Sequence, residues 1–197
     1  RIPVRRTGEG HIQTYGAHGG DLNHDGFSDF FVPNEISNDC RVFINDGTGS
    51  YANFTVHPIP NGSRPSTNES ADFNSDGNLD LAVGNSTSDS VTVFLGNGAG
   101  GFLSIRNYRA AGGIRGLAVA DLDGDGSLDL DIVTANRATG DIRILKANPL
   151  TLDDDDHDPE GEGAQSGAAG DERIDGLVGR RHLTHTGNNE EPVGDRR

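Results

Sequence analysis

The sequence of 197 residues lacks Trp and Met, and only 32% of its residues are apolar. A composition this poor in apolar residues, with 29 Gly, argues against a helical bundle and favours a chain rich in turns. No run approaches the roughly 18 apolar residues of a membrane helix, so we expect no membrane insertion. The single cysteine, Cys40, excludes an intrachain disulfide and a cysteine-rich zinc site.

Basic residues are scarce: 16 Lys and Arg face 31 Asp and Glu, which gives a formal net charge of -15. Such a chain repels nucleic acid and anionic membrane surfaces, so we expect no nucleic-acid partner and regard cations as the natural ligands. The sequence begins at Arg1 without an initiating Met or a signal-like segment, and we expect a processed product or a fragment.

An internal repeat organises the chain. The pattern Asp-x-Asn/Asp-x-Asp-Gly-x-x-Asp occurs at 21–29, 72–80 and 121–129, with starts 51 and 49 residues apart. The likeness extends past the loops, because Asp29–Tyr51 aligns without a gap on Asp80–Phe102. In the third copy two extra residues follow Asp129, where we expect a β-bulge.

The segments after each loop have the pattern of strands. Short runs rich in β-branched residues, at Arg41–Ile44, Val91–Leu95 and Asp141–Leu145, end at Gly, Asn or Asp turns, and no segment shows a helical stripe. A unit of about 50 residues with several strands fits a propeller blade better than a solenoid turn. We therefore predict an all-β fold of propeller-type blades, three of them clear, which cannot close into a ring alone.

Two regions differ in composition. Residues 1–148 hold the three predicted blades, and residues 149–197 form an acidic, polar tail too poor in apolar groups to offset its own ordering entropy. Within the tail, Asp171–Gly176 faintly repeats the loop pattern, which leaves open a degenerate fourth copy that binds no ion.

The repeated loops have the chemistry of calcium sites. Three oxygen side chains on alternate residues converge on one point, Gly supplies a positive φ, and hard oxygen ligands select Ca²⁺ over zinc. The backbone carbonyl at the seventh position completes the predicted cage. The predicted ligands are Asp21, Asn23, Asp25, Phe27 and Asp29; Asp72, Asn74, Asp76, Asn78 and Asp80; and Asp121, Asp123, Asp125, Ser127 and Asp129.

An EF-hand is the obvious competitor for these loops. That motif requires a Glu at the twelfth loop position and a helix on either side. The twelfth residues here are Val32, Val83 and Ile132, each in a strand-like run, so we predict three hairpin-loop calcium sites instead. A solvated Asp/Gly turn would explain one loop but not three copies in register.

In these loops and the strands that follow, over residues 12–148, the chain resembles the FG-GAP/VCBS repeat family, whose blades build the integrin α-subunit type of β-propeller. The resemblance implies four-stranded blades with Ca²⁺ in an inter-strand loop, an extracellular or cell-surface location, and adhesive or carbohydrate-associated roles. It fixes no ligand. Such propellers close with about seven blades, which three clear copies cannot supply.

Other signals are weaker. Four sequons, at Asn53, Asn61, Asn68 and Asn85, allow N-glycosylation in a secreted protein. His182 and His185 have a spacing that could hold a metal, although a solvated segment explains them as well. No pattern for a nucleophile or a phosphate-binding loop occurs, so we name no catalytic residue.

Three functions compete on this basis. The leading hypothesis is a non-enzymatic, extracellular, calcium-binding structural or adhesive module acting in an assembly or filament. Its expected partners are copies of itself or further blades of a longer chain, and a cell-surface protein or glycan. The alternative is an accessory or catalytic part of a polysaccharide-active extracellular enzyme. A calcium buffer with a disordered tail is a third possibility.

Overall fold

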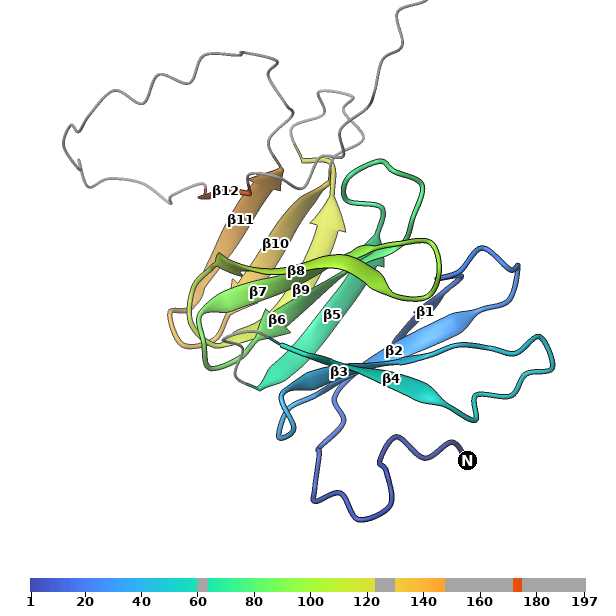
Figure 1. Ribbon diagram of the computed structural model, residues 1–197. Helices are drawn as coiled ribbons and strands as arrows, with labels where there is room; N and C mark the ends of the chain where they lie inside the picture. The colour runs from blue at the N-terminus through green and yellow to red at the C-terminus, as the bar shows by residue number, and fades with distance from the viewer. Residues whose placement is uncertain (60–63, 123–129, 148–171, 175–197) are drawn as a thin grey trace, which may run out of the picture.

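The computed structural model describes residues 1–59, 64–122, 130–147 and 172–174, and these residues form strands and turns without a helix (Figure 1). They are arranged in three separate four-stranded sheets. The prediction of an all-β fold of propeller-type blades that do not close into a ring is therefore confirmed. In this part of the chain, no helix has the length and apolar character needed to cross a membrane.

Each sheet corresponds to one repeat, and we call the sheets blades 1, 2 and 3. Blade 1 contains β1 (His18–Gly20), β2 (Asp29–Asn34), β3 (Asp39–Phe43) and β4 (Phe54–Pro58). Blade 2 contains β5 (Pro65–Ala71), β6 (Asp80–Asn85), β7 (Ser90–Gly96) and β8 (Phe102–Arg109). In both blades the strands are antiparallel and follow one another in sequence order.

Blade 3 keeps the first three strands and differs in the fourth. It contains β9 (Ile114–Ala120), β10 (Asp131–Asn136), β11 (Asp141–Ala147) and β12 (Glu172–Ile174). The strand β12 is the described part of the faint fourth copy, and it pairs with β11 in parallel, from Leu145↔Glu172 to Ala147↔Ile174. The rest of the predicted tail, including His182 and His185, lies outside the described residues.

The bulge expected after Asp129 is not where the sequence placed it. Strand β10 begins at Asp131 and pairs regularly with β11 throughout, and with β9 as far as Ala135. The pairing with β9 shifts register only between Ala135 and Asn136. Counted from the first loop aspartate, β10 begins two residues later than β6, at Asp131, so the extra length precedes β10 and leaves the sheet pairing intact.

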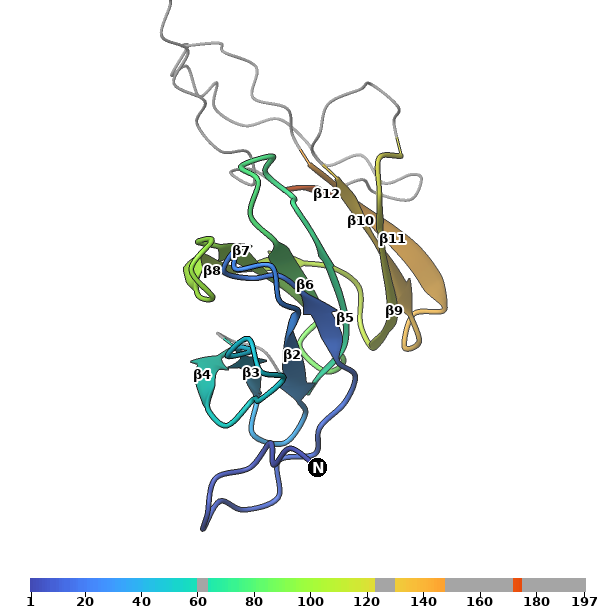
Figure 2. The same cartoon turned by 90° about the vertical axis from the view of Figure 1, so that its right-hand side faces the viewer.

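Blade 2 lies between the other two blades and packs against both (Figures 1 and 2). Successive side chains of a strand point to opposite faces, and we call the face toward the preceding blade leading and the other trailing. Leu81, Val83 and Phe94 on the leading face of blade 2 join a core cluster with Phe31, Cys40 and Val42 of blade 1.

The trailing face of blade 2 joins a second core cluster. There Ala82, Val91 and Val93 pack with Ile114, Leu117, Ile132 and Leu145 of blade 3. Both faces of blade 2 are covered, and its central strands β6 and β7 accordingly carry buried apolar residues on both faces. Residues of β6 are buried along their whole length.

Candidate functional site

The loop of each repeat joins the first two strands of its blade. In blade 1 it runs from the end of β1 to Asp29, and in blade 2 from the end of β5 to Asp80. The two loops have the same backbone shape, with positive φ at His24 (59°) and Gly26 (86°) and at the aligned Ser75 (56°) and Gly77 (87°). Glycine is required at the sixth loop position because other residues rarely adopt this conformation.

In the first loop the structure brings Asp21, Asn23 and Asp25 together through hydrogen bonds. The Asp21 carboxylate accepts from the backbone N–H of Asp25 at 3.2 Å and of Gly26 at 2.9 Å. Asn23 Nδ2 donates to Asp25 Oδ2 at 2.9 Å, and Asp25 N donates to Asn23 Oδ1 at 3.2 Å. The loop thus wraps its backbone donors around its own oxygen side chains.

The second loop repeats these bonds at the aligned residues. Asp72 accepts from Asp76 N at 3.1 Å and from Gly77 N at 2.8 Å. Asn74 Nδ2 donates to Asp76 Oδ2 at 3.0 Å, and Asp76 Oδ1 accepts from Asn78 N at 2.8 Å. Two loops with different residues at the variable positions therefore fold alike, so the shared Asp, Asn and Gly residues determine the shape.

The fourth carboxylate of each loop is turned toward backbone donors. Asp29 is buried and accepts from Leu22 N at 2.9 Å and from Asn45 N, at the end of β3, at 2.8 Å. Asp80 likewise accepts from Phe73 N at 2.8 Å and from Gly96 N at 2.7 Å. Each of these residues ties its loop to the next hairpin of its blade, a structural role that the ligand prediction did not include.

The two ends of a loop differ in electrostatics. Hydrogen bonds from the backbone, chiefly Gly26 N, lower the pKa of the half-buried Asp21. Burial raises the pKa of Asp80 to about 7 against the lowering effect of its two backbone donors, and the nearby Asp76 and Asp72 raise it further. A buried carboxylate beside two other acidic residues is a place where a bound cation would lower the electrostatic free energy.

In the third loop the anchoring role belongs to a residue that the sequence analysis did not select. Asp131 accepts from Leu122 N at 3.3 Å, as Asp29 does from Leu22 N and Asp80 from Phe73 N. It also pairs with Ala120, as Asp80 pairs with Ala71. The clue in the sequence was a second Asp two residues after Asp129. Of the predicted ligands in this loop, Asp121 is described, and Asp123, Asp125, Ser127 and Asp129 lie outside the described residues.

The loops of blades 1 and 2 also touch each other. His24 Nε2 lies 2.9 Å from Asn78 Oδ1, and Gly100 N in the β7–β8 turn donates to Leu22 O at 2.9 Å. The β7–β8 turn begins at Gly96, which is bound by Asp80. The predicted carbonyl ligand Asn78 therefore lies at the contact between the two loops. The exposed Phe27 lies beside Gly47 of its own blade.

The donor set of these loops fits Ca²⁺ in its chemistry. The first loop offers carboxylate, amide and carbonyl oxygens from Asp21, Asn23, Asp25, Phe27 and Asp29, without nitrogen or sulfur ligands. Among the described residues, however, no three His, Cys, Asp or Glu side chains converge closely enough to form a metal-binding group. The shape of the loop is thus held by hydrogen bonds to the same oxygens that a cation would share.

The sequons differ in what the fold permits. Asn85 is fully buried, and its Nδ2 donates to Ser90 Oγ at 3.1 Å and to Thr92 Oγ1 at 2.8 Å, so the folded chain has no space for a glycan there. The aligned Asn34 and Asn136 are buried as well and bond to the residue five positions on. Asn53 is exposed, Asn68 is half-buried, and Asn61 lies outside the described residues.

Comparison with known proteins agrees with the repeat. No curated protein matches the chain. The family model of the FG-GAP-like repeat matches twice, over residues 21–83 and 72–132. Each match begins at the first Asp of a loop and runs through the remaining strands of that blade into the next blade. Together the matches span more than half of the chain, and the protein therefore belongs to the family with FG-GAP-like repeats.

Proposed function

We propose that the protein is a calcium-binding structural or adhesive module that works outside the cell or at its surface. FG-GAP repeats suggest a β-repeat protein of structural or adhesive type, and they are common in extracellular and surface proteins. The observation that carries the calcium proposal is the pair of loops of identical shape, each rich in oxygen side chains and each ending in a buried carboxylate. A bound Ca²⁺ would offset that concentration of negative charge.

The chemistry of binding follows from the described residues. Asp21, Asn23 and Asp25 in the first loop, and Asp72, Asn74 and Asp76 in the second, would supply side-chain oxygens, because each keeps lone pairs beyond the backbone bonds it accepts. Asp29 and Asp80 would hold the loop in shape. Since each loop is tied to a neighbouring hairpin, binding would stiffen the blade rather than a free segment.

Calorimetric titration of the calcium-free protein tests this proposal. We expect about one Ca²⁺ per loop, and loss of one site in the variant that carries Asp72→Asn and Asp76→Asn together. Glu69→Gln is the matched control, because it removes a carboxylate on β5 that belongs to no loop. A stoichiometry of zero in the parent chain, or equal binding in the double variant, would refute the calcium assignment.

A second measurement separates the non-enzymatic proposal from the enzymatic alternative. The purified chain is incubated with a panel of extracellular glycans, and soluble products are quantified. We expect no turnover. Turnover that disappears on substitution of a single carboxylate outside the loops would overturn the assignment to a structural or adhesive module.

A further inference from the structure

The exposure of equivalent trailing positions changes along the chain. Cys40 in blade 1 and Val91 in blade 2 occupy the same position in the repeat, and both are 0% exposed. Their equivalent in blade 3, Ile142, is 64% exposed. The register of β10 and β11 places Ile142 opposite Ala135 and Ile144 opposite Val133, so these four apolar residues share the trailing face of blade 3.

The interfaces within the chain show what covers such a face. In blade 2, a methyl group added at Gly84 would lie 2.6 Å from Ile114 Cγ2, which means that blade 3 packs directly onto this position. The equivalent residue in blade 3 is Ala135, which is exposed. The trailing face of blade 3 therefore has the residues that receive the leading face of another blade, and no blade of the described part of the chain covers it.

The same chain carries a leading face of the matching kind. On blade 1, Val32, Arg41 and Phe43 are buried although none of the described blades packs on this face. Phe43 stacks with Phe30, with ring centroids 4.6 Å apart, and packs against Phe54. This aromatic leading face corresponds to Leu81, Val83 and Phe94 of blade 2, which cover the trailing face of blade 1.

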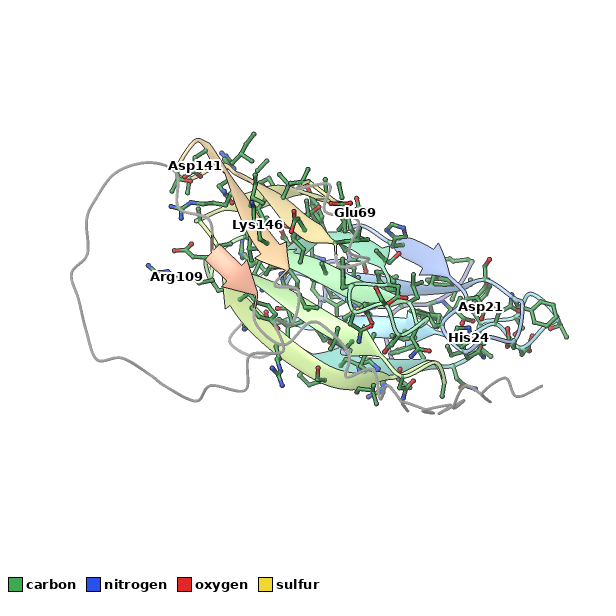
Figure 3. All side chains as sticks on the ribbon, turned by 90° about the horizontal axis from the view of Figure 1, so that it is seen from above. Asp21, His24, Glu69, Arg109, Asp141 and Lys146 are labelled. Carbon is green, nitrogen blue, oxygen red and sulfur yellow. The ribbon has the colours of Figure 1, made fainter. Side chains whose placement is uncertain are left out.

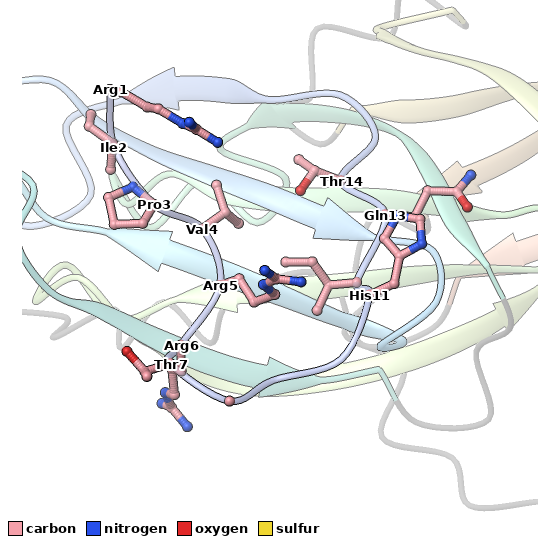
Figure 4. A pocket seen from close by; sticks show the side chains of 12 residues that line it. Arg1, Ile2, Pro3, Val4, Arg5, Arg6, Thr7, His11, Gln13 and Thr14 are labelled. Carbon is pink, nitrogen blue, oxygen red and sulfur yellow. The ribbon is translucent and has the colours of Figure 1, made fainter.

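A segment that we call the arm, residues 1–11, covers the leading face of blade 1. Arg41 Nη1 donates to Val4 O at 2.6 Å and to Glu9 Oε2 at 2.8 Å, and Arg6 lies over the Phe54 ring at 5.4 Å. The arm residues are largely exposed. They enclose, with the next few residues, an open hollow of about 860 Å³ lined by residues 1–8 and 11–14 (Figure 4). The arm is thus a loosely packed cover fixed by polar contacts.

We propose that the trailing face of blade 3 binds the leading face of blade 1 of a second copy of this chain, and that this copy's arm competes for the same face. This inference rests on the proposed structural role and specifies its partner. The two interfaces inside the chain indicate which partner binds there. In both, the trailing face of one blade packs against the leading face of the next repeat. Blade 1 offers that kind of face, and no blade among the described residues covers it.

Blade 2 lies between blades 1 and 3, so the two surfaces belong to the outer blades (Figure 1). Figure 3 shows Asp21 and His24 of blade 1 apart from Asp141 and Lys146 of blade 3. A contact between different faces is heterologous, so it extends head to tail or closes into a ring. Three bound Ca²⁺ would offset six of the fifteen net negative charges of each copy, so we expect calcium to favour the association.

Sedimentation velocity of the full chain with calcium, over a wide range of protein concentration, tests the proposal. Ile142→Asp places a charge in the trailing face and should raise the dissociation constant at least about tenfold. Leu103→Asp is the matched control, because Leu103 on β8 is 70% exposed and lies outside both proposed surfaces. Equal effects of the two variants would overturn the proposal.

A second variant addresses the arm. Glu9→Ala removes the carboxylate that holds the arm to Arg41 and should strengthen the association, whereas Glu69→Gln should leave it unchanged. A folded Glu9→Ala protein that stays monomeric at every concentration would overturn the proposal and favour further blades of a longer chain as the occupant. Calcium binding is measured calorimetrically on the same samples, so a failure of association with normal calcium binding contradicts only this inference.

Discussion

The buried carboxyl of Asp80 predicts how stability depends on pH in the absence of calcium. Its pKa in the folded chain is about 7, above the ordinary value of 3.8. The folded state therefore binds more protons than the unfolded state between these two values, and the free energy of unfolding falls as the pH rises through this window. The stabilising proton is fully present below about pH 4 and is lost as the pH passes 7.

The size of this effect follows from the shift. About three pKa units at 1.36 kcal/mol each give roughly 4 kcal/mol between pH 4 and pH 8, of which about half is lost between pH 5 and pH 7. His57 acts in the opposite direction, because burial lowers its pKa and its contribution to stability grows as the pH rises toward 6.5. A variant is therefore needed to separate the contribution of Asp80 to the pH dependence of stability from that of His57.

Urea unfolding at a series of pH values in excess EDTA measures the effect. We expect the free energy of unfolding of the parent chain to fall by about 2 kcal/mol between pH 5 and pH 7 relative to that of Asp80→Asn, which cannot ionise. Millimolar calcium should abolish the difference in slope, since a cation stabilises the ionised carboxylate. Parallel pH profiles of the two proteins in EDTA would refute the assignment of a raised pKa to Asp80.

Three further predictions concern stability. Calcium at about ten times its dissociation constant should raise the free energy of unfolding by about 1.4 kcal/mol per site. EDTA should therefore lower the melting temperature, and an unchanged melting temperature would contradict this prediction. Asp131→Ala should destabilise the calcium-free chain by about 1 kcal/mol in urea unfolding, because it leaves the part-buried backbone N–H of Leu122 without this acceptor, and Asp129→Ala should not. Gly84→Ala should cost about 1–3 kcal/mol by the same measurement, because its methyl group would lie 2.7 Å from Thr67 Cγ2 and closer still to Ile114.

The sequence by itself determined the class of fold and the places where function is expected. The loops could be recognised because their shape depends on local chemistry, namely alternating oxygen side chains and a glycine that accepts positive φ. The strands could be recognised because apolar runs between turns repeat with the same spacing. Aligning the repeats then identified equivalent positions in different blades, such as Val91 and Ile142.

The tertiary structure decided which residues hold the loops and which faces are covered. Asp129 and Asp131 are equivalent choices in the sequence, and only strand pairing places Asp131 beside Leu122 N. Burial of Asn85 depends on partners across the hairpin. The parallel pairing of β12 and the contact of Arg41 with the arm join segments that are distant in sequence. These features depend on long-range packing, and a repeat pattern, which records local chemistry and spacing, carries no information about it.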